Sequence, residues 1–151
     1  MGEIHKRAWC ESVLKYMRRI LYFDTREELD IRLKQSIKNC DSLIDIGCGI
    51  NPTDIVQPKN IHILLEPFEQ YAKVLKKRTE KYTKSLIIRE DALEFLGKLA
   101  DNSIDSIVLF DVIEHIEYEI GLKVIEECKR VVKKQIIIST PLGFHEQVPG
   151  E

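Results

Sequence analysis

The chain has 151 residues, of which 44% are hydrophobic and 32% are charged, and its formal net charge at pH 7 is −2. This length fits one compact domain that buries about 70% of its unfolded surface, so folding needs neither disulfides nor metal. The near balance of charges argues against binding nucleic acid or an anionic membrane by bulk charge. No apolar run approaches the length of a spanning helix, the amino terminus lacks an apolar signal region, and the four cysteines form no C-x-x-C pair. We therefore expect a single cytoplasmic domain that does not enter a membrane.

Two amphipathic helices are expected before the first strand. Between Glu3 and Phe23, apolar side chains recur at three- and four-residue steps, with basic residues in the gaps. Thr25 followed by Glu28 is typical of a capping box, and the apolar pattern behind it predicts a second helix that ends near Asn39. Residues 1–41 are thus expected to form a helical cap on the core of the domain.

Residues 42–151 have the pattern of repeated βα units. Short strands rich in Ile, Leu and Val alternate with longer charged stretches, which predicts an α/β fold with a mostly parallel sheet. The strands are expected at Leu43–Ile46, Ile61–Leu65, Leu86–Arg89, Ile104–Phe110 and Gln135–Ser139, and helices at Pro67–Tyr82, Ala92–Leu99 and Glu117–Lys133. Pro52 and Pro58 restrict the first crossover, Gly47–Asn60, so its helix is expected to have only one or two turns.

Glycines and an aspartate follow the first expected strand, in the segment D-I-G-C-G. Ligands of an open parallel sheet bind at the carboxyl ends of the strands, and glycines let the backbone turn sharply and approach a ligand. The Asp45 carboxylate can accept from an ammonium group or hold the loop. Position 52 is Pro rather than the third glycine of a dinucleotide fingerprint, which disfavours a nicotinamide or flavin dinucleotide.

Acidic residues also follow the second and third expected strands. Glu66 follows the second strand, and an acidic side chain there can accept hydrogen bonds from both hydroxyls of a ribose. Asp91 follows the third strand and can accept from an exocyclic amine, while the backbone of Ala92 and nearby apolar groups wall a flat base. The ligand is therefore expected to carry a ribose and a base.

These segments, together with F-D-V-I-E-H-I after the fourth strand, resemble class I S-adenosylmethionine-dependent methyltransferases over about Leu43 to Gly143. The resemblance implies a Rossmann-like, doubly wound, five-stranded sheet of order 3-2-1-4-5, and S-adenosylmethionine as the cofactor, with S-adenosylhomocysteine as the product. The residues implied to border the cofactor are Asp45, Gly47, Cys48 and Gly49 at its methionine part, Glu66, followed by Pro67, at the ribose, Asp91 and Ala92 at the adenine, and Phe110, Asp111 and Val112 beneath it. Cys48 has no base paired with it in the sequence, so we interpret it as loop packing rather than as a nucleophile.

The reaction of such a cofactor asks little of the protein, because holding an acceptor in line about 3 Å from the sulfonium methyl supplies most of the rate. An oxygen or carbon acceptor also needs a base, and His115, with Glu114 beside it, is the candidate. The alternative interpretation is that both residues support the loop after the fourth strand. The charge balance favours a small-molecule acceptor, and RNA and protein acceptors stay open.

A metal site is a second interpretation of the same cluster. Asp111, Glu114 and His115, with His145 further on, are similar to the divalent-metal ligands of the small-RNA 2′-O-methyltransferases, which use E-x-x-E-H and a later histidine. Here Asp replaces the first Glu of that pattern. We expect no metal in the main interpretation.

The resemblance departs from the family at the carboxyl end. The family sheet usually has seven strands and ends in an antiparallel hairpin, which this sequence is expected to lack, since it ends shortly after the fifth strand. The strand Gln135–Ser139 would then lie at an open edge, so we expect a truncated chain, a homodimer or another partner across that edge. A non-catalytic cofactor-binding or scaffolding module is the alternative to an active enzyme.

Two further features receive a structural interpretation. The basic run Lys73–Lys84 is interleaved with apolar residues, which is typical of a solvated helix face rather than of a nucleic-acid patch. His5 and His62 have no partner visible in the sequence, so a surface role or a satisfied core role is expected for both.

Overall fold

The computed structural model describes residues 21, 23–36, 38–55, 57–81 and 84–141. The expected helix Glu3–Phe23 falls almost wholly outside these residues, as do His5 and His145. The described residues form a five-stranded, all-parallel sheet of order β3-β2-β1-β4-β5. Its strands are β1 Ser42–Ile46, β2 Ile61–Leu65, β3 Ser85–Ile88, β4 Ile104–Phe110 and β5 Val132–Ser139. The expected α/β class and strand order are confirmed.

Four α-helices and one short 3-10 helix accompany the sheet in the described part of the chain. They are α2 Arg26–Ser36, α3 Glu69–Thr79, α4 Ala92–Gly97, η1 Ile113–His115 and α5 Tyr118–Val131. The expected cap of α2 is present, because the Glu28 amide donates to Thr25 Oγ1 at 3.2 Å. The Glu28 carboxylate accepts in turn from the Asp24 amide at 3.4 Å.

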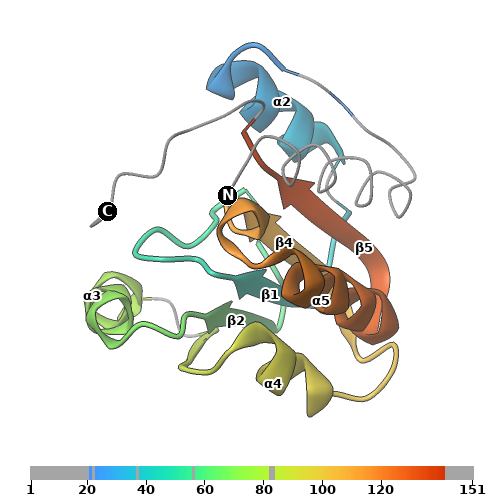
Figure 1. Cartoon of the computed structure of the whole chain (residues 1–151). Coiled ribbons are helices and arrows are strands. Elements are labelled where there is room, and N and C mark those ends of the chain that lie inside the picture. Colours follow the sequence, from blue (N-terminus) through green and yellow to red (C-terminus); the bar gives the residue numbers. More distant parts are fainter. Residues whose placement is uncertain (1–20, 22, 37, 56, 82–83, 142–151) are drawn as a thin grey trace.

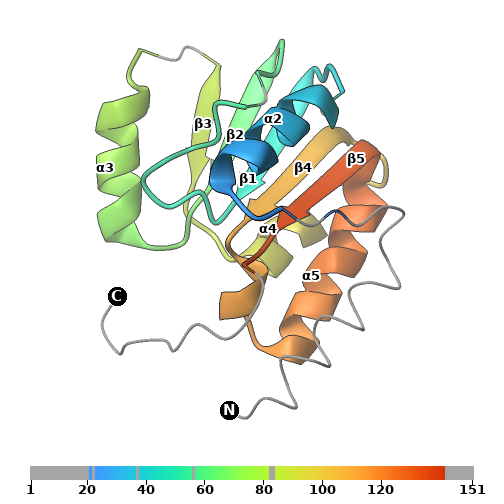
Figure 2. The same cartoon turned by 90° about the horizontal axis from the view of Figure 1, so that it is seen from above.

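The two faces of the sheet are covered differently (Figure 1). Helices α4 and α5 lie on one face, whereas α2, α3 and the crossover between β1 and β2 lie on the other. In Figure 2, α2 crosses in front of the sheet and α4 lies behind it. The main apolar core fills the α4 and α5 side and includes Ile44, Ile63, Ile107, Leu109, Leu96 and Val124. The opposite face has a smaller buried cluster, made of Cys40, Leu43 and Val108, with Phe110 and Ile137 packed against it.

The crossover between β1 and β2 contains turns and bends but no helix in its described residues, 47–55 and 57–60. The expectation of one or two helical turns there is therefore wrong. Pro52 and Pro58 restrict the backbone, and side chains hold the loop instead of a helical ladder. The Thr53 amide donates to Asp45 Oδ2 at 2.7 Å, and Arg78 of α3 donates to the Ile50 carbonyl at 2.9 Å and to the Asn51 side chain.

Strand β5 begins at Val132, three residues before the expected start at Gln135, so α5 ends at Val131 instead of Lys133. The extension is stabilised by charge, since Lys134 Nζ lies 2.9 Å from Asp105 Oδ2 and Lys133 Nζ lies 3.9 Å from Asp105 Oδ1. Sequence periodicity could not detect this pairing between distant residues. Helices α3 and α4 are also shorter than expected, because Phe68 is extended at the start of α3 and Lys98 caps the end of α4.

Strands β3 and β5 form the two edges of the sheet. Near the start of β5, the Gln135 side chain accepts from the Lys38 amide at 3.1 Å and donates to the Lys38 carbonyl at 3.5 Å. A partner or second copy along the rest of this edge stays a prediction. In the described part of the chain, no helix has the length and apolar character needed to cross a membrane.

Candidate functional site

The glycine loop after β1 has the backbone that its residues predict. Gly47 and Gly49 have φ values of +64° and +57°, which L side chains rarely adopt. A Cβ on Gly47 would lie 2.8 Å from Val112 Cγ2, so this glycine also allows the loops after β1 and β4 to touch. A Cβ on Gly49 would meet nothing within 4 Å. The loop is thus packed at Gly47 and open at Gly49.

Asp45 lies beneath this loop and is 2% exposed. Its carboxylate accepts from the Thr53 amide, and burial raises its pKa from 3.8 to about 7. His62 of β2 is close, with Nε2 3.8 Å from Asp45 Oδ2, a separation too long for a hydrogen bond. Of the two roles expected for Asp45, holding the loop is the one seen here, and contact with a ligand is a proposal.

Glu66 follows β2 and is buried, with 3% of its surface exposed. One carboxylate oxygen accepts from the Gly49 amide and the other from the Phe68 amide, both at 2.9 Å. Glu66 therefore ties the glycine loop to the start of α3. Each carboxylate oxygen can accept a second hydrogen bond, so the group keeps capacity for a hydroxyl. Pro67, next in the chain, is exposed.

Asp91 and Ala92 lie after β3 at the start of α4. The Asp91 side chain caps this helix by accepting from the Leu93 amide at 2.8 Å. Asp91 is exposed and Ala92 is half-buried. Only one oxygen of Asp91 makes this bond, which leaves the other as an acceptor at the same edge of the sheet as Glu66.

The loop after β4 carries Phe110, Asp111 and Val112. Asp111 has a φ of +54°, a left-handed conformation that Asp tolerates better than most residues. Its amide donates to the Ser139 carbonyl at 2.9 Å, which fixes the ends of β4 and β5 together. Its carboxylate lies 3.3 Å from Arg26 Nη1 of α2, so α2 reaches this edge of the sheet.

Glu114 and His115 follow in η1. Glu114 is half-buried, and neither of its carboxylate oxygens makes a hydrogen bond of normal geometry to a described residue. Burial raises its pKa, and the backbone amide of Glu114 and the charge of His115 oppose the increase. His115 is exposed. A partly desolvated carboxylate beside an imidazole, at the end of a central strand, is a group that can accept a proton from a ligand.

A metal site receives no support from the described residues, where no three His, Cys, Asp or Glu side chains gather closely enough to hold an ion. His145, the fourth member of the metal interpretation, lies outside them. Cys48 is half-buried between the two glycines, and burial, Asp45 and Glu66 all raise the pKa of its thiol. These surroundings oppose a thiolate nucleophile.

Comparison with protein-family models matches residues 44–138 to the methyltransferase domain. That match covers more than half of the chain and includes the ends of β1 to β4. The chain belongs to the methyltransferase domain family. A search of curated proteins finds no match.

Solved structures agree with this assignment of the methyltransferase domain at the level of the fold. A S-adenosylmethionine-dependent methyltransferase from Archaeoglobus fulgidus is 23% identical, with a TM-score of 0.58, and the match covers 78% of this chain and 53% of that one. Magnesium protoporphyrin IX methyltransferase from Synechocystis PCC 6803, with bound S-adenosylmethionine, is 13% identical, with a TM-score of 0.57, covering 74% and 55%. Phosphoethanolamine N-methyltransferase 1 from Haemonchus contortus is 13% identical, with a TM-score of 0.58, covering 88% and 31%. The methyltransferase domain described here therefore spans about half the length of the first of these structures.

Sequence reasoning missed two arginines and a histidine of this methyltransferase domain. Arg26 contacts Asp111 across the loop after β4, and Arg78, within the basic run interpreted as a solvated face, holds the crossover. Neither had a signal in the sequence, because each bond joins residues far apart in the chain. His62 was expected at the surface or satisfied in the core. That expectation is wrong, because His62 is buried and its Nε2 has no hydrogen-bond partner among the described residues.

Proposed function

We propose that this methyltransferase domain binds S-adenosylmethionine at the carboxyl edge of its sheet and transfers the methyl group to a small-molecule acceptor. The observation that carries the proposal is the buried Glu66 carboxylate, which accepts a hydrogen bond from the Gly49 amide. Of the two glycines in this loop, Gly49 is the one that faces open space. An acidic group after the second strand, beside a glycine loop, is the arrangement that accepts the ribose of a nucleoside cofactor.

The donors and acceptors along this edge fit the cofactor in kind. Asp45 would offer a carboxylate to the ammonium of the methionine part, with Gly47, Cys48 and Gly49 leaving room for it. Glu66 and the adjoining Pro67 would border the ribose, and the uncommitted oxygen of Asp91 would accept from the adenine amine beside Ala92. Phe110, Asp111 and Val112 would form the floor, since Val112 packs against Gly47.

The cofactor, when bound, supplies an electrophilic methyl group. The protein then has to hold the acceptor in line and, for an oxygen or carbon acceptor, remove a proton. Glu114 suits the second task, because burial raises its pKa and leaves its carboxylate without a hydrogen-bond donor of normal geometry among the described residues. We propose Glu114 and His115 as the groups that take this proton.

A small-molecule acceptor is supported by the charge balance of the chain, since Lys and Arg number 23 against 25 Asp and Glu. Two of the similar structures are titled for chemically different acceptors, phosphoethanolamine and magnesium protoporphyrin IX. Acceptor choice therefore does not follow from the fold. The proposal names the class of acceptor and not its identity.

Calorimetric titration of S-adenosylhomocysteine into the chain tests the cofactor site. We expect binding that Glu66→Ala weakens at least about a hundredfold, equivalent to about 2.8 kcal/mol, because both a ligand contact and the support of Gly49 are lost. Glu126→Ala, at an exposed position of α5, is the matched control and should bind like the native chain. Absence of binding by the folded native chain, or equal binding by the two variants, would contradict the proposal.

A further inference from the structure

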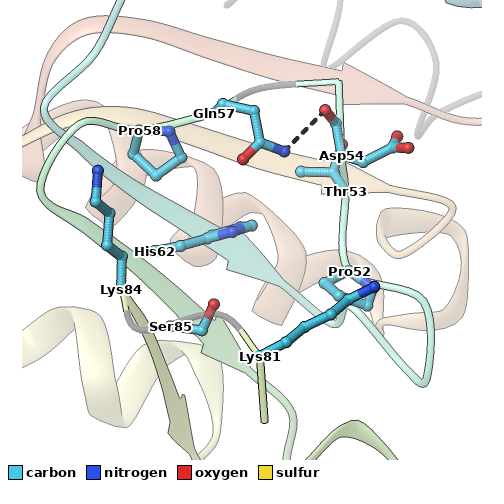
Figure 3. Close-up of a pocket in the computed structure, with 9 residues that line it drawn as sticks. All are labelled: Pro52, Thr53, Asp54, Gln57, Pro58, His62, Lys81, Lys84 and Ser85. Atoms are coloured by element: carbon cyan, nitrogen blue, oxygen red, sulfur yellow. Dashed lines mark hydrogen bonds between the residues drawn. The ribbon is translucent and has the colours of Figure 1, made fainter. Parts of the chain in front are cut away.

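A cavity of about 210 Å³ lies between the crossover and the start of β3 (Figure 3). Its lining includes Thr53 and Asp54 of the crossover, His62 of β2, and Lys81, Lys84 and Ser85 at the chain entry into β3. His62 is the second residue of its strand and Ser85 the first, whereas Glu66 and Asp91 follow the same two strands. The cavity is therefore at the opposite ends of β2 and β3 from the cofactor edge.

His62 is an unusual group for this position. It is 8% exposed, and its Nε2 is buried without a hydrogen-bond partner among the described residues. Buried polar atoms are nearly always bonded, so an unpartnered one points to a missing ligand or water. His62 pairs in register with Ser85 across β2 and β3, so the two side chains lie on the same face of the sheet. Figure 3 shows the Ser85 hydroxyl directed toward the imidazole.

The charged groups that line the cavity favour an anion. Behind the imidazole, Asp45 Oδ2 lies 3.8 Å from His62 Nε2, and burial raises the pKa of that carboxyl to about 7, so below this pH most of it is protonated and uncharged. In Figure 3 the Lys84 and Lys81 side chains lie on opposite sides of the imidazole, whereas the carboxylate of Asp54, the one acid among the described lining residues, is directed away from it. The Gln57 amide is occupied by the Asp54 carbonyl at 3.1 Å. Lys84 and Ser85 offer an ammonium and a hydroxyl donor to the cavity, and such donors are the partners of phosphate and carboxylate groups.

We propose that this cavity is a binding site for a compact oxyanion, held by the Lys84 ammonium and the Ser85 hydroxyl with the His62 imidazole as its floor. The shared chemistry is that of a phosphate or a carboxylate group. The proposal does not depend on the proposed methyl transfer, because none of these three residues belongs to the candidate cofactor site.

The experiment is a titration of the full chain with inorganic phosphate, followed through the imidazole resonances of its four histidines by NMR. His62→Gln identifies the resonance of His62. We expect this resonance to shift to saturation while the exposed His115 does not respond. The apparent pKa of His62, which burial lowers from 6.5 to about 4, should rise with phosphate, because a bound anion favours the imidazolium.

Lys84→Met and Lys77→Met form the matched pair of variants. Both lysines are exposed, but Lys77 lies on α3 and does not line the cavity. Lys84→Met should weaken phosphate binding at least about tenfold, and Lys77→Met should leave it unchanged. An unresponsive His62, or equal phosphate affinity in the two variants, would overturn the proposal. A parallel titration with succinate assigns the oxyanion: saturation by phosphate alone indicates a phosphate site, and saturation by both indicates that carboxylates are also accepted.

Discussion

The two faces of the sheet are stabilised in different ways. On the face covered by α4 and α5, β1, β2 and β4 contribute a continuous apolar cluster with regular helices against it. On the opposite face, the irregular crossover covers Asp45 and His62, which are buried polar groups, and the apolar cluster beside them is smaller. One face thus derives its stability from packing, and the other holds a loop with carboxylates and backbone amides.

This difference indicates where the molecule gives up stability for binding. A buried carboxylate such as Asp45 costs free energy unless it is paired, and its pKa of about 7 reflects that cost. Glu66 and Asp91 are engaged with backbone amides along the same edge. The polar groups gather where the proposed cofactor would meet the sheet, whereas α4 and α5 pack on a large apolar cluster.

The largest expected effect comes from matched truncations in β1. Leu43 and Ile44 are neighbours, both are fully buried, and they belong to the small and the large apolar cluster respectively. Ile44→Ala should lower the free energy of unfolding by about 2–5 kcal/mol, since helix-covered packing collapses little around a cavity. Leu43→Ala should cost less, because an irregular covering can relax. Denaturant unfolding measures both, and an equal or larger cost for Leu43→Ala would remove the proposed difference between the faces.

A smaller effect is expected from alanine in the glycine loop. Both Gly47→Ala and Gly49→Ala force an L residue to positive φ, at about 1–2 kcal/mol each. Gly47→Ala should cost more, because its Cβ would also meet Val112, whereas the Cβ of Gly49→Ala enters open space. Gly49→Ala should instead weaken S-adenosylhomocysteine binding, since that space is where we propose the cofactor lies. Thermal unfolding measures the stability of the two variants, and calorimetry measures their affinity for S-adenosylhomocysteine. A Gly49→Ala variant less stable than Gly47→Ala would be inconsistent with this packing.

The smallest effect is expected from the ion pair between Arg26 and Asp111, whose side chains are 60% and 45% exposed. Arg26→Ala, which also removes the exposed ion pair between Arg26 and Asp30, should change the free energy of unfolding by at most about 1 kcal/mol, and high salt should abolish the difference. Arg32→Ala, on the same helix and without an acidic partner among the described residues, serves as the control. A decrease in the free energy of unfolding that exceeds about 1 kcal/mol and does not depend on salt would show that α2 is fixed to the site more firmly than an exposed ion pair allows.

Much of the fold could be predicted from the sequence because it depends on local patterns. The alternation of apolar strands with charged helices indicated the parallel sheet, and the Thr25 and Glu28 pair indicated the start of α2. Glycines at 47 and 49 likewise indicated a sharp turn, which their positive φ values confirm. These signals are carried by neighbouring residues.

The features that could not be predicted depend on contacts between distant residues. The early start of β5 depends on Lys134 reaching Asp105, and the crossover depends on Arg78 and Asp45 instead of a helix. The burial of His62 beside Asp45 follows from strand pairing that no periodicity encodes. The roles proposed for the residues at the carboxyl edge stay predictions.

Asp45 allows the most direct test of the claim that the polar face trades stability for binding. Between about pH 4 and 7 the unfolded chain has ionised this carboxyl while the folded chain still holds its proton, so the free energy of unfolding falls as the pH rises through this window. Asp45→Asn removes that loss and keeps an acceptor for the Thr53 amide.

The measurement is the free energy of unfolding and the S-adenosylhomocysteine affinity of Asp45→Asn and the native chain, side by side, above pH 7. The account predicts a variant that is more stable, by up to about 1.4 kcal/mol for each pKa unit that burial adds, and that binds the ligand more weakly. A variant that is less stable and binds S-adenosylhomocysteine as well as the native chain would contradict it.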